Sequence, residues 1–330
     1  MVAERAIPKI QYSFVPVRAC DMCGGARFAT LGERLGGRTG VNPRRSAGLA
    51  TGVKRCQDCG LVFSDPRPVP ADLSDHYGVE AVDYFSADQL NAPPGFFQTE
   101  ITAARRLLGG GRLKALDVGA GSGNVMLALE AAGIEAWGLE PGAHFRDFAI
   151  RRGIAPERIV QAPIETAELP PASFDFVSLN AVLEHLQDPA AAIERAMTWL
   201  RPGGILYVEV PSADWLMAKI ANSFFHLRGA NYVTNISPLH PPYHLYEFTP
   251  RSFETHAKRA GYEVAETHHY VCAVLGAPRI LHPALTALMK RTRSGMEFTV
   301  WLRKNGEAQP HDCRAETSGT AANPMQNRTE

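Results

Sequence analysis

Residues 113–124 read LKALDVGAGSGN, an apolar run that ends in three glycines, Gly119, Gly121 and Gly123. Glycines at this spacing allow the backbone to turn tightly at the end of a strand and to approach a ligand closely. The stretch therefore predicts a buried strand followed by a ligand-binding turn, which is the start of many α/β folds.

Apolar runs and helical segments alternate downstream of this turn. Strands are expected at 113–118, 135–140, 159–163, 174–180 and 204–210, and helices at 124–133, 143–153 and 189–200. Repeated strand–helix units of this kind predict a parallel, doubly wound sheet. Thr249 and Pro250 then begin a further helix that ends at Gly261, and two late strands follow at 262–270 and 296–304.

The rest of the chain divides by composition. Residues 1–70 are rich in Gly, Arg and Cys, and 71–112 are expected to form a helical linker and cofactor cap that ends at the glycines 109–111. The main domain is expected at 113–304, with an aromatic-rich insert at 212–247 that could act as a lid or as a packing or dimer contact. Residues 305–330 have almost no apolar content and are expected to be disordered.

Composition indicates a protein without a membrane span. The chain has 330 residues, of which 45 % are hydrophobic and 21 % charged, with a net charge of zero. No apolar run approaches the ~18 residues that a span needs, and the start, MVAERAIPKI, lacks the apolar core of a signal peptide. A cytoplasmic location is expected. Positive charge is concentrated in residues 1–70, which hold 11 Lys and Arg but 5 Asp and Glu.

The glycine turn alone does not identify its ligand. The dinucleotide fingerprint G-x-G-x-x-G would place its last glycine at 124, where this chain has Asn124. Glu140 ends the second expected strand, 23 positions after Asp117. A carboxylate there can accept hydrogen bonds from both hydroxyls of a ribose, which fits a dinucleotide or S-adenosylmethionine.

Four motifs in order resolve this choice. LDVGAGSGN, LEP, FDFVSLNAVLEHLQDP and LRPGGILYVEVP resemble the motifs of class I S-adenosylmethionine-dependent methyltransferases over about 113–304. The resemblance implies a Rossmann-like seven-stranded sheet in which the seventh strand is inserted antiparallel beside strand six. CDMCGG, RCQDCGLVFSDPRP and HLYEFTPRSFETHAKRAGY extend it to a bacterial subgroup with an N-terminal zinc module, whose members often act on sugars, polysaccharide precursors or natural products.

The resemblance also implies which residues bind S-adenosylmethionine. The glycine turn would meet the methionine part, with Asp117 facing the ammonium, and the LEP motif would hold the ribose. The turn after the third strand would border the adenine, and the end of the fourth strand would lie under the sulfonium. The expected cofactor-binding residues are Asp117, Gly119, Ala120, Gly121, Glu140, Pro141, Ile164, Glu165, Asn180 and Ala181.

Two histidines are candidate catalytic residues. His185, in LEHL, follows the fourth strand, where the acceptor and the methyl group should meet, and a neutral imidazole there could take the acceptor's proton. Glu184 could be its partner. The segment SPLHPPYHLYEF, with His244, supplies the second candidate. His240 and His244 are four apart, but the two prolines between them exclude a metal-binding pair on one helix. The alternative for His185 is a histidine packed at a helix end.

Two C-x-x-C pairs predict a zinc site. Cys20, Cys23, Cys56 and Cys59 supply four thiolates, which fill a tetrahedral shell and leave no position for water, so the zinc is expected to be structural. The gap between the pairs is longer than in the usual zinc ribbon. Cys272 and Cys313 do not stand at a metal-ligand spacing from another cysteine and are expected to be ordinary residues.

The expected reaction is methyl transfer to a small-molecule acceptor, with oxygen slightly favoured over nitrogen or carbon. An RNA methyltransferase is an alternative, supported by the basic zinc region and disfavoured by the zero net charge. A cofactor-binding or assembly protein without activity is a second alternative, and a nicotinamide dehydrogenase is a distant third. The oligomeric state is left open.

Overall fold

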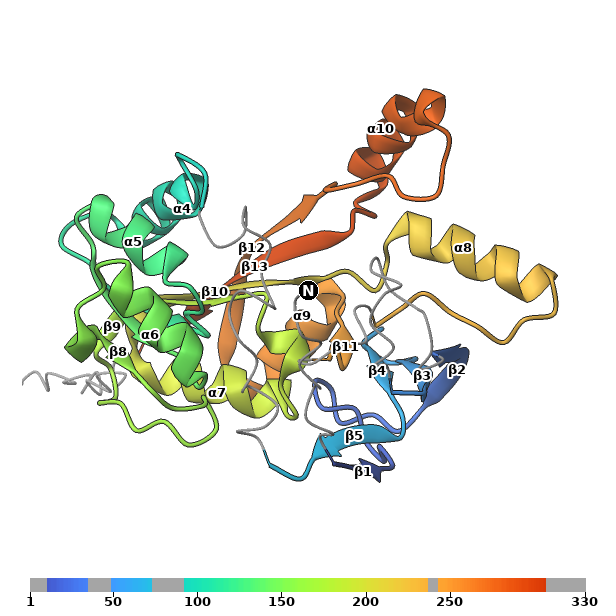
Figure 1. The fold of residues 1–330 in the computed structure, drawn as a ribbon, viewed down its shortest axis with the longest axis horizontal. Coiled ribbons are helices and arrows are strands. Elements are labelled where there is room, and N and C mark those ends of the chain that lie inside the picture. Colours follow the sequence, from blue (N-terminus) through green and yellow to red (C-terminus); the bar gives the residue numbers. More distant parts are fainter. Residues whose placement is uncertain (1–10, 35–48, 73–91, 237–242, 307–330) are drawn as a thin grey trace, which may run out of the picture.

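The computed structural model describes residues 11–34, 49–72, 92–236 and 243–306. Its largest element is a seven-stranded sheet in the order β12-β13-β10-β9-β6-β7-β8 (Figure 1). The strands are β6 (Lys114–Val118), β7 (Glu135–Leu139), β8 (Ile159–Val160), β9 (Phe174–Asn180), β10 (Leu200–Pro211), β12 (Tyr262–Tyr270) and β13 (Glu297–Lys304). The last strand, β13, pairs antiparallel with both β10 and β12. This confirms the expected α/β fold with its inserted seventh strand.

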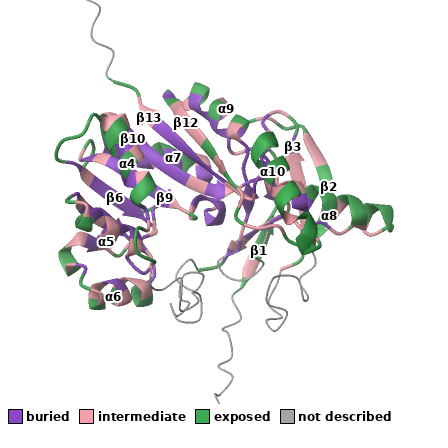
Figure 2. Cartoon of the chain, turned by 90° about the horizontal axis from the view of Figure 1, so that it is seen from above, coloured by how far each residue is buried: buried purple, intermediate pink, exposed green. Residues whose placement is uncertain are grey.

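Helices cover both faces of this sheet because side chains alternate along each strand. Phe176 and Tyr207 belong to the apolar cluster that contains α4 (Gln98–Leu108) and α5 (Asn124–Ala131), whereas Val177 and Leu206 belong to the cluster that contains α7 (Pro189–Trp199) and α9 (Pro250–Ala260). In Figure 2 the strands between them are largely buried. Further helices are α6 (Ala143–Arg151), α8 (Leu216–Leu227) and α10 (His282–Thr292).

The N-terminal strands form a second sheet that includes a strand from far along the chain. Its order is β11-β4-β3-β2, built from β2 (Phe28–Arg34), β3 (Thr51–Cys56), β4 (Val62–Ser64) and β11 (Tyr246–Glu247). A separate ribbon pairs β1 (Tyr12–Val15) with β5 (Arg67–Pro70). Residues of both sheets share one apolar cluster, which includes Phe63 of β4 and Phe253 of α9. The small sheet is therefore packed into the main core.

Several expected segments differ in detail or lie outside the described residues. Two late strands were expected without a crossover helix, and α10 does not serve as one, because it connects the antiparallel pair β12 and β13. The insert forms α8, which extends away from α5 and α6 in both views (Figures 1 and 2). Its role as a lid stays a prediction. His240, Cys313, residues 73–91 of the linker and nearly all of the tail lie outside the described residues.

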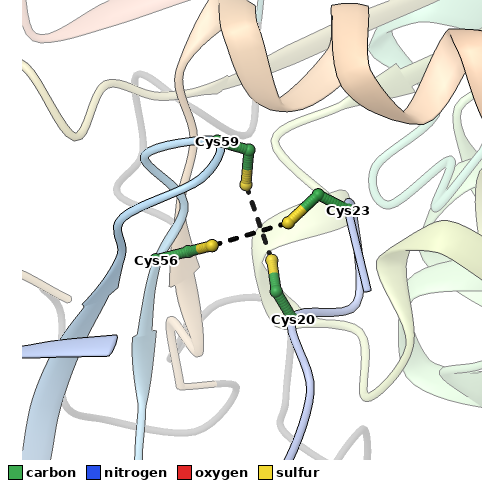
Figure 3. A group of neighbouring side chains, drawn as sticks. All are labelled: Cys20, Cys23, Cys56 and Cys59. Atoms are coloured by element: carbon green, nitrogen blue, oxygen red, sulfur yellow. Dashed lines mark hydrogen bonds between the residues drawn. The ribbon is translucent and has the colours of Figure 1, made fainter. Parts of the chain in front are cut away.

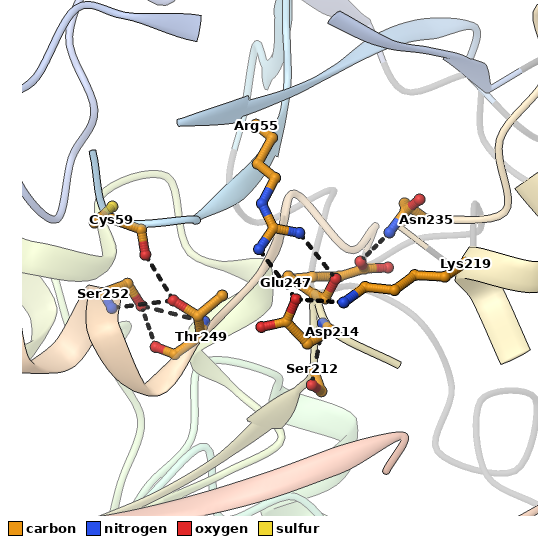
Figure 4. A network of polar contacts seen from close by, with 10 residues as sticks. Arg55, Cys59, Ser212, Asp214, Lys219, Asn235, Glu247, Thr249 and Ser252 are labelled. Atoms are coloured by element: carbon orange, nitrogen blue, oxygen red, sulfur yellow. Dashed lines mark hydrogen bonds and ion pairs between the residues drawn. The ribbon is translucent and has the colours of Figure 1, made fainter. Parts of the chain in front are cut away.

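A polar network connects the small sheet to the segment that follows β10 and to α8 (Figure 4). Arg55 of β3 donates to Asp214 over 3.0 Å, and Lys219 of α8 contacts the same carboxylate at 2.8 Å. Glu247 of β11 is buried and accepts hydrogen bonds from Asn235 and from the backbone N–H of Ile236. Burial raises the pKa of the Glu247 carboxyl to about 7, against the opposing effect of these hydrogen bonds.

Thr249 fixes the start of α9 against the small sheet, and its removal tests this junction. Its hydroxyl accepts from the backbone N–H of Ser252 and donates to the carbonyl of Cys59. Because a buried cap and a second hydrogen bond are lost together, Thr249→Ala should lower the free energy of unfolding by about 1–3 kcal/mol in urea titrations. Thr255→Ala, which removes an exposed hydroxyl from the same helix, should change it by less than about 0.5 kcal/mol. Equal losses in the two variants would contradict this role of Thr249.

Candidate functional site

The glycine turn after β6 requires glycine for conformational and steric reasons. Gly119 has a φ of 72°, and a Cβ there would lie 2.5 Å from Cγ2 of Val182. Its N–H and that of Ala120 both donate to the carbonyl of Leu139, at 2.7 and 3.0 Å. These bonds hold the turn against the end of β7 and leave no room for a side chain at position 119.

Glu140 and the glycine turn form one hydrogen-bonded unit. The carboxylate accepts from the N–H of Gly121 through Oε2 and from the N–H of Gly142 through Oε1, each at 2.8 Å. Burial raises the pKa of Glu140 to about 7, while the two backbone bonds oppose that rise. Each oxygen retains a second lone pair that can accept a ligand hydroxyl.

Asp117 lies beneath the turn. It is buried on β6, and its Oδ1 accepts a 2.7 Å hydrogen bond from the hydroxyl of Ser178 on the neighbouring strand β9. Burial raises the pKa of Asp117 to about 7, the charge of Glu140 adds to this effect, and the Ser178 bond opposes it. A cationic ligand group above the turn would stabilise the ionised form.

The remaining expected cofactor residues follow neighbouring parallel strands. Pro141 comes after β7, Ile164 and Glu165 after β8, and Asn180 and Ala181 at the end of β9. The carboxyl ends of parallel strands share one edge of a sheet, so these residues follow strands that end at the same edge. Ile164 is buried and Glu165 is exposed. Their contacts with a ligand stay predictions.

The end of β9 has a constrained backbone. Ala181 has a φ of 54°, in the left-handed region that non-glycine residues seldom adopt, and its N–H donates to the carbonyl of Glu209 on β10. Such conformations are concentrated at functional sites. Oδ1 of Asn180 is buried and has no hydrogen-bond partner among the described residues, so it is available to a ligand.

Glu184, His185 and His244 form a cluster beside this strand end. Oε1 of Glu184 lies 3.9 Å from Nε2 of His185 and 3.9 Å from Nε2 of His244, and the two imidazole rings meet edge to face with centroids 4.7 Å apart. Nδ1 of His185 contacts the carbonyl of Tyr243 at 3.1 Å. Burial raises the pKa of Glu184 to about 8, and the charges of Glu209 and Glu297 add to the effect.

The sequence identifies both histidines but not their proximity. They are separated by 58 intervening residues, and the contact depends on the backbone N–H of Leu245, which donates to the carbonyl of Glu184 over 2.7 Å. Glu184 was expected to be a partner of His185 or to lie behind it, and it contacts both imidazoles. The sequence signals available were the short segments LEH (183–185) and YHL (243–245), each of which contains one of the two histidines.

The four expected cysteines converge at a second site (Figure 3). Sγ of Cys20 lies 3.5 Å from Sγ of Cys59, and Sγ of Cys23 lies 3.5 Å from Sγ of Cys56. All four sulfurs lie within 4.8 Å of one another. Sulfurs ~2.3 Å from a tetrahedral zinc ion would be ~3.8 Å apart, so the arrangement fits zinc with only small adjustments.

Comparisons with known proteins agree with these motifs. A family profile described as "Methyltransferase domain" matches residues 80–267. Two curated relatives are named "Ubiquinone biosynthesis O-methyltransferase". The relative from Pectobacterium carotovorum is 28 % identical over 132 residues, which cover 38 % of this chain and 52 % of that protein. The relative from Photorhabdus laumondii is 31 % identical over 133 residues, with the same coverage of both chains. The chain spans about half the length of these relatives.

Two similar solved structures carry the same class of name. One is an S-adenosylmethionine dependent methyltransferase from Mesorhizobium loti, with 17 % identity and a TM-score of 0.45, covering 63 % of this chain and 97 % of that one. The other is a complex between the Haloferax volcanii Trm112 methyltransferase activator and a second protein described as a methyltransferase, with 17 % identity and a TM-score of 0.46, covering 64 % of this chain and 90 % of that one.

Substitution of Gly119 tests the turn. In Gly119→Ala the new methyl group would overlap Val182, so the turn and the end of β9 must move, and affinity for the expected ligand, S-adenosylmethionine, should fall at least tenfold in calorimetry. Gly133→Ala is the matched control, since Gly133 has nearly the same φ, 73°, but no atom within 4 Å of the added Cβ. Its affinity should stay within about twofold of the wild type. Unchanged binding by Gly119→Ala would contradict the proposed use of this turn.

Proposed function

The chain belongs to the methyltransferase-domain family and is an S-adenosylmethionine-dependent methyltransferase; from that premise we propose that it methylates an oxygen of a small-molecule acceptor. The single observation that carries this proposal is the cluster of buried Glu184 and His185 with half-buried His244 beside the end of β9. An oxygen acceptor must lose a proton to become a good nucleophile, and a cluster of this composition suits that task.

The residues near the glycine turn fit the methyl donor. Glu140 would accept hydrogen bonds from the ribose hydroxyls, and Asp117 would face the ammonium group. Asn180 and Ala181 would border the sulfonium, because they follow the strand adjacent to β6. When bound, S-adenosylmethionine supplies an electrophilic methyl group, so the protein itself needs only to align the acceptor and to exclude water.

The relatives support oxygen as the acceptor atom. The curated proteins described above are named as O-methyltransferases, and the match to them covers about half of their length. The resemblance of the N-terminal motifs extends the proposal to sugars, polysaccharide precursors or natural products. The acceptor would lie against Nε2 of His185 and of His244, and its oxygen would lose its proton there before or during attack on the methyl carbon.

The four thiolates are proposed to hold one structural zinc ion. They supply four soft ligands and leave no open coordination position. The carbonyl of Cys59 accepts from Thr249 at the start of α9, and the carbonyl of Met22 accepts from Arg259 near its end. Zinc would therefore stabilise the packing of α9 as well as the small sheet.

Donor affinity should depend on pH through Glu140. Because its pKa is raised to about 7, the carboxyl is increasingly protonated as the pH falls below 7, and a protonated carboxyl accepts ribose hydrogen bonds less well. The Kd for S-adenosylmethionine should therefore rise as pH falls from 8 to 6. Glu140→Gln should weaken binding by about 10- to 100-fold and reduce this dependence to the part that Asp117 contributes, because the pKa of Asp117 is also raised to about 7, whereas Glu130→Gln on the exposed side of α5 should do neither. Wild-type affinity in Glu140→Gln would exclude this role.

His185 should affect turnover rather than donor binding. Replacement by alanine removes one imidazole from the acceptor side, so kcat should fall by roughly 10²–10⁴ while affinity for S-adenosylmethionine stays within about threefold. Product formation from labelled donor and calorimetry give the two values. His226→Ala on the exposed side of α8 is the control and should leave both unchanged. Near wild-type turnover in His185→Ala would remove the histidine from the reaction.

Metal analysis tests the zinc site. Protein from zinc-sufficient medium should contain about one zinc per chain, and Cys56→Ser should lose most of it because one of four ligands is replaced by a hydroxyl. Cys272→Ser should keep its zinc, since that exposed thiol contacts Glu297 instead. A full zinc content in Cys56→Ser, or equal loss in both variants, would contradict the assignment.

A further inference from the structure

Two carboxylates share one face of the main sheet, next to the end of β9. Glu209 of β10 is in register with Asn180 of β9 and with Thr299 of β13, and Glu297 precedes Thr299 by two residues on the same strand. Residues in register project from the same face of a sheet, and diagonal neighbours on adjacent strands are only ~7–8 Å apart. The side chains of Glu209 and Glu297 are therefore neighbours, and Asn180 lies beside them.

The same face receives a third carboxylate from α4. Tyr207, two residues before Glu209, packs edge to face against Phe97 at the start of α4, with ring centroids 5.5 Å apart. Its hydroxyl donates to Oε2 of Glu209 over 2.9 Å. Glu100, in the first turn of α4, lies near enough to act on Glu209 electrostatically. All three carboxylates are half-buried, and we call them the carboxylate face: Glu100, Glu209 and Glu297.

The carboxylate face has no cationic partner in the part of the chain that the structure describes. Arg106 of α4 and Arg303 of β13 form their ion pairs with Glu266 and Glu263 instead. Burial raises the pKa of Glu209 to about 7, and the charges of the other two carboxylates add to the effect. Like charges at this separation repel each other in the free protein, and a bound cation would reverse that effect.

Glu184 provides a second, independent observation. Its side chain is 2 % exposed, and its Oε2 is buried without a hydrogen-bond partner among the residues that the structure describes. The charges of Glu209 and Glu297 act on it, so it lies close to the carboxylate face. A buried carboxylate oxygen that lacks a donor is costly, and its lone pairs are open to N–H groups of a ligand. This place therefore suits a ligand that brings both positive charge and hydrogen-bond donors.

We propose that the acceptor carries an ammonium group beside the hydroxyl that is methylated, and that Glu184, Glu209 and Glu297 bind this ammonium. The substrate class is then an amino alcohol, and this inference rests on the proposed function. An ammonium has three N–H donors and no acceptor, which matches carboxylates that have open lone pairs and no cation of their own.

The position of Glu184 connects this ammonium site to the reaction. Its Oε1 lies 3.9 Å from Nε2 of His185 and from Nε2 of His244. An ammonium bound to Glu184 would thus hold a hydroxyl on a neighbouring carbon beside the two imidazoles. The ammonium of the donor is assigned elsewhere, to Asp117 on β6, and β9 separates that strand from β10. The carboxylate face is therefore left for the acceptor.

An acceptor without the amine should be discriminated against, because it would leave these carboxylates unpaired. Three matched pairs of probes test this: D-glucosamine and D-glucose, 2-aminocyclohexanol and cyclohexanol, and dopamine and 4-ethylcatechol. Each is titrated into the complex with S-adenosylhomocysteine, and binding is followed by saturation-transfer nuclear magnetic resonance. In at least one pair the amine should bind about tenfold more tightly than its partner, since charge-assisted hydrogen bonds are gained.

Variants locate the preference. Glu209→Gln and Glu297→Gln should each reduce the preference for the amine at least about fivefold, while S-adenosylhomocysteine still binds within about threefold of the wild type and shows that the variant is folded. Glu263→Gln is the matched control, because this exposed carboxylate of β12 pairs with Arg303 and does not belong to the carboxylate face. It should keep the full preference.

The outcomes separate this inference from the proposed function. If no amine binds better than its partner, or if the preference persists in both Glu209→Gln and Glu297→Gln, the ammonium site is overturned and the methyltransferase assignment stands. Loss of S-adenosylhomocysteine binding in Glu209→Gln would assign that carboxylate to the donor and also overturn the inference. A preference for amines that disappears in the two variants, with the labelled methyl group transferred to nitrogen, supports the ammonium site and contradicts methylation of oxygen.

Discussion

The backbone of Leu245 connects the small N-terminal sheet to the segment that carries Glu184 and His185. Its N–H donates to the carbonyl of Glu184 over 2.7 Å, and its carbonyl accepts from the N–H of Ser64 over 3.0 Å. Ser64 belongs to β4, which begins three residues after Cys59, and β4 pairs with β11 immediately after Leu245. Two backbone hydrogen bonds and the short chain between Cys59 and Ser64 thus connect the cysteine cluster to the segment that carries His185. His244 precedes Leu245 and is held beside His185 by the same two bonds.

The donor side depends on a different balance, between burial and charge. Asp117 and Glu140 are both buried at the carboxyl edge of the sheet, and burial raises both pKa values to about 7. Keeping two carboxylates in such a place is unfavourable for folding alone. Hydrogen-bond donors and a positive charge on a ligand would recover that cost, so the arrangement costs stability in the free protein and favours binding of the donor.

The sequence predicts the main sheet well because its signals are local. Glycines at 119, 121 and 123 end β6, Gly133 ends α5, and the Thr249–Pro250 start and Gly261 end of α9 are where the sequence places them. Each of these positions depends on backbone chemistry within a few residues.

What the sequence does not show depends on distant contacts. The two residues of β11 carry no strand signal of their own, and they become a strand only because β4 offers a free edge. The contact of Glu184 with His244 depends in turn on that pairing. Composition does not predict the packing of the cysteine region into the main core either, because that packing joins residues of the N-terminal strands to residues of α9 almost 200 positions later.

A crystal structure with S-adenosylhomocysteine bound is the most direct test of this account. It should show both ribose hydroxyls on the carboxylate of Glu140 and the sulfur above Asn180 and Ala181, on the side that faces Glu184, His185 and His244. A sulfur that points away from these three residues would contradict the proposed acceptor side. A nucleoside that does not contact Glu140 would contradict the proposed donor side.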